Sequence, residues 1–272
     1  MDELENAELQ SEIQSEAVEP EPEITRSDRP AARLNVRAPI TQAMTIKDIV
    51  KTHCPPSWEG VFESAKNELN DVSDILAAEE KTHGMFYPLK KDIFRAFWLT
   101  PLGKISAVLV GQDPYHGGVP SQPQAVGLSF SVARQAPIPP SLKTMYSELV
   151  RTGFTAPSHG DLSDWARRGV LLLNSSLTVR PGTPGSHGQL WFGFVYKVIL
   201  GICEHNPHCV FILLGKPAQK LQKMLGDRVS IVTSGHPSPL NRFDPFCGSD
   251  TFLKVNALLE KSKQQPIDWS LS

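Results

Sequence analysis

The sequence Ile105-Ser106-Ala107-Val108-Leu109-Val110 runs directly into Gly111-Gln112-Asp113-Pro114-Tyr115-His116. The apolar first half predicts a strand that is buried on both faces, and the glycine and proline of the second half predict a turn after it. The loop that leaves this strand therefore carries an acid, an aromatic ring and a histidine together. In open α/β sheets the ligand crevice lies outside the carboxyl ends of the strands. We interpret this loop as a candidate active-site loop, and an ordinary Asp-Pro turn is the alternative.

Three further apolar runs also end in polar residues. Residues 170–173 run into Asn174, residues 210–214 run into Gly215 and Lys216, and residues 229–232 run into a segment that contains His236. Because the carboxyl ends of parallel strands meet at one edge of a sheet, the pattern predicts that Asp113, Asn174, Lys216 and His236 lie near each other.

Segments of helical length and periodicity separate these runs. One has Leu142, Tyr146, Leu149 and Val150 on one face, and a later one has Val195, Val198, Ile199 and Ile202. Strands that alternate with helices pair in parallel through right-handed crossovers. The predicted fold class is α/β, a single domain with three α/β/α layers and a central, mainly parallel four-stranded sheet.

The net charge of −2 hides an uneven distribution. Residues 1–24 contain nine acids and no Lys or Arg, which leaves 27 bases against 20 acids in the rest of the chain. The N-terminal stretch lacks aromatic residues, which is typical of disorder, and a basic, proline-containing stretch follows it. We predict a disordered acidic tail and basic linker over residues 1–43 and one catalytic domain over residues 44–272. The mildly basic domain is compatible with a polyanionic partner.

Composition excludes several classes of protein. No run of about twenty apolar residues is present, so no membrane span is expected, and the acidic N-terminus does not resemble a secretory signal. Four cysteines in 272 residues do not form a disulfide framework, which favours a reducing compartment.

Two motifs and several shorter stretches occur together in a fixed order. The motifs are residues 111–116 and His236-Pro237-Ser238-Pro239-Leu240, and the shorter stretches are residues 127–132, 139–142, 159–163, 169–174, 177–180 and 266–269. Together they resemble the family 1 uracil-DNA glycosylases over roughly residues 56–272. The resemblance implies a DNA repair enzyme that releases uracil and leaves an abasic site in base excision repair.

The resemblance also implies which residues perform the reaction. Asp113 matches the catalytic aspartate, which either orients and deprotonates a water molecule or stabilises a cationic sugar. His236 matches the residue that hydrogen-bonds uracil O2 as negative charge builds there. Asn174 matches the base reader, Phe130 the ring on which uracil stacks, and Tyr115 the ring that excludes the C5 methyl group of thymine. Gln112 matches a residue that lines the same pocket.

A second group of residues matches positions that contact DNA. Leu240 corresponds to an apolar wedge that fills the stack when the target base is flipped out. Pro139, Pro140, Ser141 and Ser238 match elements that grip the phosphate backbone. The other expected DNA-binding residues are His116, Lys216 and Arg242. The implied partners are uracil-containing single- and double-stranded DNA, and replication or repair proteins through the N-terminal tail. We expect a monomer in the nucleus, or in a host nucleus for a viral protein.

Other residues have simpler interpretations. Trp165 and Trp191 lie in amphipathic segments and are predicted to be core residues. The stretch 203–209 contains two cysteines and two histidines, but it spans a helix end and a strand start, so we expect no metal there. No cofactor is expected. An alternative function is a DNA-binding or polymerase-accessory scaffold on the same fold, with catalysis secondary.

Overall fold

The computed structural model describes residues 38–241 and 246–272. Most of the predicted tail and linker, and Arg242 among the predicted DNA contacts, lie outside these residues. Residues 38–43, the last part of the predicted linker, are described, and Gln42 accepts a hydrogen bond through its carbonyl oxygen from Lys90 Nζ at 2.8 Å. The first helix, α1 (Ile46–His53), begins in a capping box in which Thr45 and Asp48 bond to each other's backbone N–H groups.

A parallel sheet of four strands forms the centre of the domain. Its order is β4–β1–β5–β6, with β4 at Val170–Asn174, β1 at Ala107–Gly111, β5 at Val210–Leu214 and β6 at Ser230–Ser234. Every residue of β1, β4 and β5 is buried, as expected for apolar strands covered on both faces. The predicted parallel four-stranded α/β fold is therefore confirmed, although β1 begins at Ala107 and not at Ile105.

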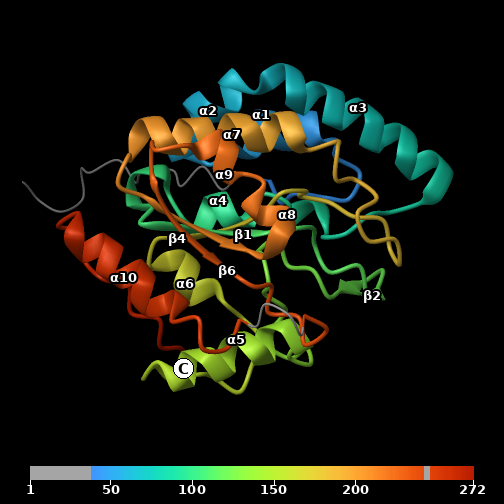
Figure 1. The fold of residues 1–272 in the computed structure, drawn as a ribbon. Helices are drawn as coiled ribbons and strands as arrows, with labels where there is room; N and C mark the ends of the chain where they lie inside the picture. The colour runs from blue at the N-terminus through green and yellow to red at the C-terminus, as the bar shows by residue number, and fades with distance from the viewer. Residues whose placement is uncertain (1–37, 242–245) are drawn as a thin grey trace, which may run out of the picture. The chain divides into compact units, whose positions relative to one another are not determined.

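Helices cover both faces of the sheet (Figure 1). On one side lie α1, α2 (Glu59–Ser64), α3 (Lys66–His83) and α7 (Phe192–His205), and on the other lie α5 (Pro140–Arg151), α6 (Ser163–Arg167) and α10 (Thr251–Lys261). Short helices complete the layers: α4 (Arg95–Leu99), α8 (Gly215–Gln219), α9 (Gln222–Leu225) and the 3₁₀ turns η1 (Pro56–Trp58), η2 (Lys90–Asp92) and η3 (Leu102–Lys104). The two-stranded ribbon β2 (Gly118–Val119) and β3 (Gln122–Pro123) was not expected from the sequence.

The two long crossover helices bury the predicted apolar faces, with one exception. Val195, Val198, Ile199 and Ile202 of α7 are all buried. In α5, Leu142, Tyr146 and Leu149 are buried, but Val150 is 59% exposed, so its predicted place on the buried face was wrong. Met145 takes that place, because it lies three residues before Glu148 and four before Leu149 on the same side of the helix.

The tryptophans predicted to be structural lie in the core. Trp165 and Trp191 are fully buried, and each indole N–H has a partner, the carbonyl oxygen of Trp269 at 2.8 Å and the Thr178 hydroxyl at 2.7 Å. Among the residues described here, no helix is both long enough and apolar enough to cross a bilayer.

Candidate active site

A cavity of about 220 Å³ opens at the carboxyl edge of β1 and β4. Its lining contains the predicted residues Gln112, Asp113, Tyr115, His116, Phe130, Ser141, Asn174 and His236. These residues come from five separate stretches of the chain. Three of them, at residues 112–116, 174 and 236, meet because parallel strands end at one edge, whereas Phe130 comes from a loop and Ser141 from α5. The parallel topology thus brings together the acid, the amide and the imidazole that the sequence singled out.

Long-range backbone hydrogen bonds hold the loop that carries Asp113. The carbonyl oxygen of Gln112 accepts from Ser176 N at 3.0 Å and from Ser175 Oγ at 2.6 Å. The carbonyl oxygen of His116 accepts from Gly182 N at 3.0 Å. Residues 112–116 are therefore fixed against the loop that follows β4, and this contact sets the position of the carboxylate.

The Asp113 carboxylate is half-buried, and among the described residues its hydrogen-bond partner is a backbone N–H group. Gly185 N donates to its Oδ2 at 2.6 Å, which leaves Oδ1 available to a ligand or water. Sequence reasoning missed Gly185 and its neighbour Pro184, which also lines the cavity. The glycine-rich, proline-rich run at residues 181–188 was the available signal, since such runs form loops whose backbone groups approach other groups closely.

The carboxamide of Asn174 lies over the end of β1, where the register pairs Asn174 with Gly111. A Cβ at Gly111 would come within 2.3 Å of Asn174 Oδ1, so only glycine leaves room for this amide. Asn174 is 7% exposed, and its side chain has no hydrogen bond to another residue that the structure describes. A buried amide without a protein partner is strongly selective for a ligand that supplies the matching donor and acceptor.

Phe130 is held in a conformation that non-glycine residues seldom adopt. Its φ is +61°, in the left-handed region. Both neighbours are anchored, since Ser129 Oγ donates to Leu109 O at 3.1 Å and Ser131 Oγ donates to Gly160 O at 3.3 Å. The surrounding structure therefore imposes this conformation and places the ring in the cavity wall, which is typical of functional positions.

Tyr115 forms the adjoining wall. Its hydroxyl donates to the carbonyl oxygen of Phe130 at 3.3 Å, which ties the two aromatic residues together. Burial raises the pKa of the Tyr115 phenol far above its ordinary value, so the hydroxyl stays protonated and remains a donor.

The protonation of His236 follows from its contacts. Ser238 N donates to His236 Nδ1 at 3.0 Å, so Nδ1 is an acceptor and the neutral ring carries its proton on Nε2. Burial lowers the pKa of His236 below its ordinary value, which favours this neutral form. Gly215 makes room for the residue, because a Cβ there would lie 2.8 Å from His236 Cβ.

The segment after His236 forms a compact turn that exposes Leu240. Asn241 N donates to Ser238 O at 2.9 Å, and Leu240 N donates to Ser238 Oγ at 3.3 Å. The Leu240 side chain is 87% exposed, as expected for the tip of a loop.

The remaining predicted DNA contacts lie around the mouth of the cavity or near it. Pro139 caps α5, Pro140 is its first residue, and Ser141 lines the cavity. Lys216 is exposed on α8, directly after Gly215, but it does not line the cavity.

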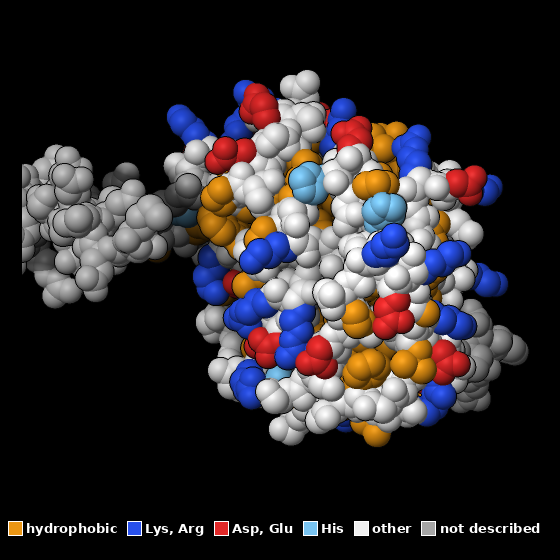
Figure 2. Space-filling model, turned by 90° about the vertical axis from the view of Figure 1, so that its left-hand side faces the viewer, with side chains coloured by type: hydrophobic (Ala, Val, Ile, Leu, Met, Phe, Trp, Pro, Cys, Tyr) orange, Lys and Arg blue, Asp and Glu red, His pale blue; other side chains and the backbone are white. Residues whose placement is uncertain are grey.

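Figure 2 shows the face seen from the left of Figure 1, away from β2. On this face basic and acidic side chains are interspersed.

Two other groups of residues lie away from the cavity. His187 is buried between Thr178 Oγ1 and Glu79 Oε1, both at 2.8 Å from its ring nitrogens, as expected for a structural histidine. In the stretch 203–209, Cys203 and Cys209 are buried, whereas His205 and His208 are exposed. The side chains of this stretch therefore point in different directions.

A second, largely apolar cavity of similar volume adjoins the first. It shares Gly111, Gln112, Phe130 and His236 with the first cavity, and α7 and the short helices α8 and α9 supply its other walls. The two cavities thus meet at the Phe130 and His236 rings, whose centroids are 6.0 Å apart.

Comparison with known proteins points to one family. The Uracil DNA glycosylase superfamily matches residues 97–260. Uracil-DNA glycosylases from Yersinia pseudotuberculosis serotype O:1b (strain IP 31758) and Yersinia pestis (strain Pestoides F) are each 44% identical over 219 residues, covering 78% of this chain and 94% of theirs. The crystal structure of mimivirus uracil-DNA glycosylase superposes with a TM-score of 0.74 at 28% identity, over 79% of this chain and 87% of that one. The chain belongs to the uracil-DNA glycosylase superfamily.

Proposed function

We propose that this protein is a monofunctional uracil-DNA glycosylase that hydrolyses the N-glycosidic bond of uracil in DNA, releasing free uracil and leaving an abasic site for base excision repair. The observation that carries the proposal is the convergence of Asp113, Tyr115, Phe130, Asn174 and His236 on one cavity. A carboxylate, a neutral imidazole that can donate an N–H, and a carboxamide that has no hydrogen bond to another described residue are the groups that this reaction needs.

His236 stabilises the leaving base. Negative charge develops on uracil O2 as the bond breaks, and the Nε2–H of a neutral imidazole can donate to that oxygen. A neutral donor suits this step because it stabilises the anion without a prior proton transfer. Donors of this kind typically lower the activation barrier by about 3–4 kcal/mol.

Asp113 acts on the sugar side of the reaction. The deoxyribose becomes cationic as uracil departs, and a carboxylate lowers the energy of that charge, as in glycoside hydrolysis. The hydrogen bond from Gly185 fixes one carboxylate oxygen, and the other oxygen can orient or deprotonate the attacking water.

The pocket selects uracil by shape and by hydrogen bonding. The Asn174 amide accepts from N3–H and donates to O4, whereas cytosine presents the reversed pattern and leaves the buried amide mispaired. Tyr115 occupies the space that the C5 methyl group of thymine needs, Phe130 stacks on the base, and Gln112 closes the pocket through its backbone.

The target base must leave the duplex before it can reach this pocket. Leu240 fills the vacated stack, and Pro139, Pro140, Ser141, Ser238, His116, Lys216 and Arg242 contact the phosphate backbone. Such contacts position the enzyme without reading sequence, and both single- and double-stranded DNA are substrates.

A uracil-release assay tests the proposal directly. Oligonucleotides with one uracil, thymine or cytosine are incubated with the protein, and abasic sites are cleaved by alkali and resolved on a gel. Release from the uracil oligonucleotide alone is expected. Tight binding to uracil-containing duplex without any release would favour the alternative, a DNA-binding or polymerase-accessory scaffold.

The proposal extends to the parts of the chain. Residues 44–272 form the catalytic unit, and the tail recruits replication or repair proteins. A chain that starts at residue 38 keeps the Gln42 contact with buried Lys90 and should retain full uracil release.

The protein acts as a monomer, which light scattering would test. It acts in the nucleus, or in a host nucleus for a viral protein, which a fluorescent fusion would test.

A further inference from the structure

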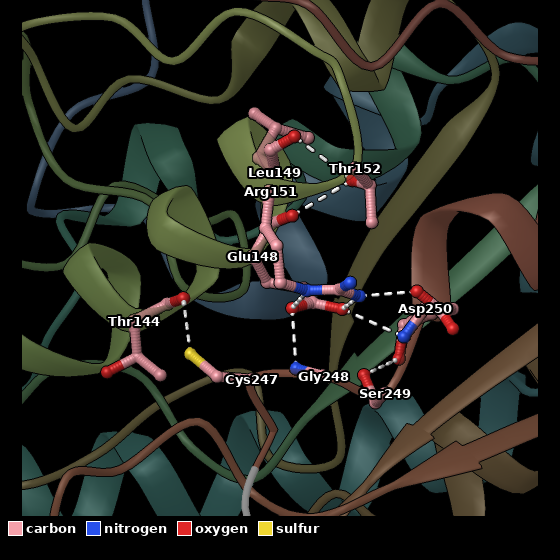
Figure 3. A network of polar contacts seen from close by, with 10 residues as sticks. Thr144, Glu148, Leu149, Arg151, Thr152, Cys247, Gly248, Ser249 and Asp250 are labelled. Atoms are coloured by element: carbon pink, nitrogen blue, oxygen red, sulfur yellow. Dashed lines mark hydrogen bonds and ion pairs between the residues drawn. The ribbon is translucent and has the colours of Figure 1, made fainter.

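Glu148 is a fully buried carboxylate that lies outside the candidate active site. It stands on α5, and four hydrogen bonds satisfy its two oxygens (Figure 3). Arg151 donates Nε to Oε2 at 2.7 Å and Nη2 to Oε1 at 2.8 Å. The backbone N–H groups of Gly248 and Asp250 donate to Oε2 at 2.7 Å and to Oε1 at 2.8 Å.

This arrangement keeps the buried carboxylate charged. Burial alone would raise the pKa of the Glu148 carboxyl, but the hydrogen bonds from Arg151, Gly248 and Asp250 outweigh burial and lower the pKa below its ordinary value. Removing one member of such a buried, fully hydrogen-bonded ion pair strongly destabilises the fold, because the other member is then left without a partner. Glu148 is thus a fixed anchor for whatever it binds.

The anchored residues form the last part of the segment that leaves β6. This segment carries His236 and Leu240, and after the described residues 246–250 it enters α10. Gly248 and Asp250 have φ values of +87° and +55°, and this left-handed backbone accompanies two N–H groups that converge on one carboxylate. Cys247 Sγ also donates to Thr144 O at 3.8 Å, and Arg151 pairs with the Asp250 side chain.

The other end of α5 reaches the candidate active site. Ser141, in the first turn of α5, lines the cavity, and Glu148 lies about two helical turns further on. The first turn of α5 therefore contacts the cavity, and its last turn anchors the end of the segment that runs from β6 to α10.

We propose that Glu148 is a positioning residue. By holding Gly248 and Asp250, it places the Leu240 segment, the chain between β6 and α10, at the correct distance from the uracil pocket when the protein engages a duplex. This inference rests on the proposed function. The first end of the segment is held without Glu148, because it continues from β6, which pairs with β5 in the sheet. Loss of the anchor therefore affects the step that needs the exposed leucine and spares the chemistry in the pocket.

Glu148→Gln is the variant that tests this inference. Glutamine keeps the shape of the side chain but replaces one acceptor oxygen with a donor, so a backbone N–H or the Arg151 guanidinium loses its partner. We expect the rate of uracil release from duplex to fall about ten-fold, while the rate on single strands stays within about two-fold, because only the duplex has a stack to open. Rates are measured at a temperature where circular dichroism shows both proteins fully folded.

Glu80→Gln is the matched control. Glu80 pairs with the buried Lys90 at 2.7 Å on α3 and has no described contact with the Leu240 segment. This variant should lose stability without changing the ratio of duplex to single-strand rates. A ratio that changes equally in both variants would reduce Glu148 to a general structural role and overturn the inference.

A double-mutant cycle separates positioning from independent effects. If Glu148 acts through Leu240, Glu148→Gln should change the ratio little when Leu240 is already alanine. Additive effects, or an unchanged ratio in folded Glu148→Gln, would overturn the inference. Should Glu148→Gln fail to fold, Arg151→Met at the half-exposed partner position decides in the same way. Absence of release from single strands by the wild type would instead contradict the proposed function.

Discussion

The two loops that face each other across the candidate active site are held in opposite ways. Residues 112–116 are fixed by hydrogen bonds to a different part of the chain, the loop that begins at Ser175. Residues 236–241 have described hydrogen bonds among themselves, such as those from Ser238 N to His236 Nδ1 and from Asn241 N to Ser238 O. The first loop is placed by the domain core, whereas the second keeps its own shape and depends on how its two ends are attached. Each loop carries a residue that we propose for the chemistry, Asp113 in the first and His236 in the second, and the second loop also carries Leu240, which we propose engages the duplex.

Removal of the charge of Asp113 should lower the rate of uracil release more than any other change, and by the same factor on duplex and single-stranded DNA. Asp113→Asn lacks the carboxylate that meets the cationic sugar, so we expect release to fall by roughly 10²- to 10³-fold or more on duplex and single strands alike. Single-turnover rates and binding to uracil-containing DNA are measured together. Unchanged binding with slow release supports the assignment, and a rate within a few-fold of wild type removes Asp113 from the mechanism.

The next largest effects are expected from substitutions at the two residues that we propose select the base, Asn174 and Tyr115. Asn174→Asp reverses part of the donor and acceptor pattern and should admit cytosine weakly, and Tyr115→Ala opens space at C5 and should admit thymine. Each variant should lose about ten- to a hundred-fold in uracil release, because a buried polar group or a packing surface is disturbed. Oligonucleotides with one cytosine or one thymine report the new activity, and Phe192→Ala, outside the first cavity, serves as a control. If neither variant releases the new base, these residues do not read it.

Truncation of the exposed Leu240 should affect duplex and single-stranded DNA differently. Leu240→Ala should lower release from duplex by about ten-fold and from single strands much less, because only the duplex must be unstacked. The ratio of the two rates is the measurement. An unchanged ratio would show that Leu240 is not the wedge, and the second loop would then lose its proposed role in engaging the duplex.

The smallest expected effect concerns pH. The pKa of His236 is lowered by burial, so the ring binds protons less readily in the folded state than in the unfolded state, where the pKa is about 6.5. The unfolded chain then holds more protons between these two values. The stability contributed by His236 is present above pH of about 6.5 and is lost as the pH falls through the folded pKa.

Nitrogen NMR of the imidazole checks this prediction. We expect the Nε2–H tautomer at neutral pH and a midpoint below about 6.5, with less than about two-fold loss of neutral His236 on going from pH 7.5 to 6.5. A proton on Nδ1 would contradict the hydrogen bond from Ser238 as the determinant of the tautomer, and a midpoint above that of a free histidine would contradict the effect of burial on the pKa.

The sheet and most of the cavity could be predicted from the sequence because short-range signals agreed with each other. Apolar runs that end in polar residues define β1, β4, β5 and β6, and parallel pairing then places Asp113, Asn174 and His236 together. Lys216 was grouped with them because it also follows a strand, but the helix that starts at Gly215 leaves it outside the cavity lining.

The contacts that could not be predicted are those between loops and between side chain and backbone. Gly185, which binds Asp113, and Glu148, which holds Gly248 and Asp250, are about 70 and 100 residues away from their partners along the chain. Neither contact follows a helical or strand period, so hydrophobic patterning carries no information about it. A charged residue among Leu142, Met145 and Leu149 was the one visible sign that α5 has a second buried role.

The left-handed backbone at Phe130 has a consequence for the speed of inspection. The conformational cost of that residue is met when the chain folds, so the ring is already in place before any nucleotide arrives. A base that swings out of a helix is outside the stack only briefly, and a pocket that first had to rearrange would lose most of these visits. Under the function proposed above, in which Phe130 stacks on a flipped base, the preformed ring lets each visit end at once in either capture or rejection.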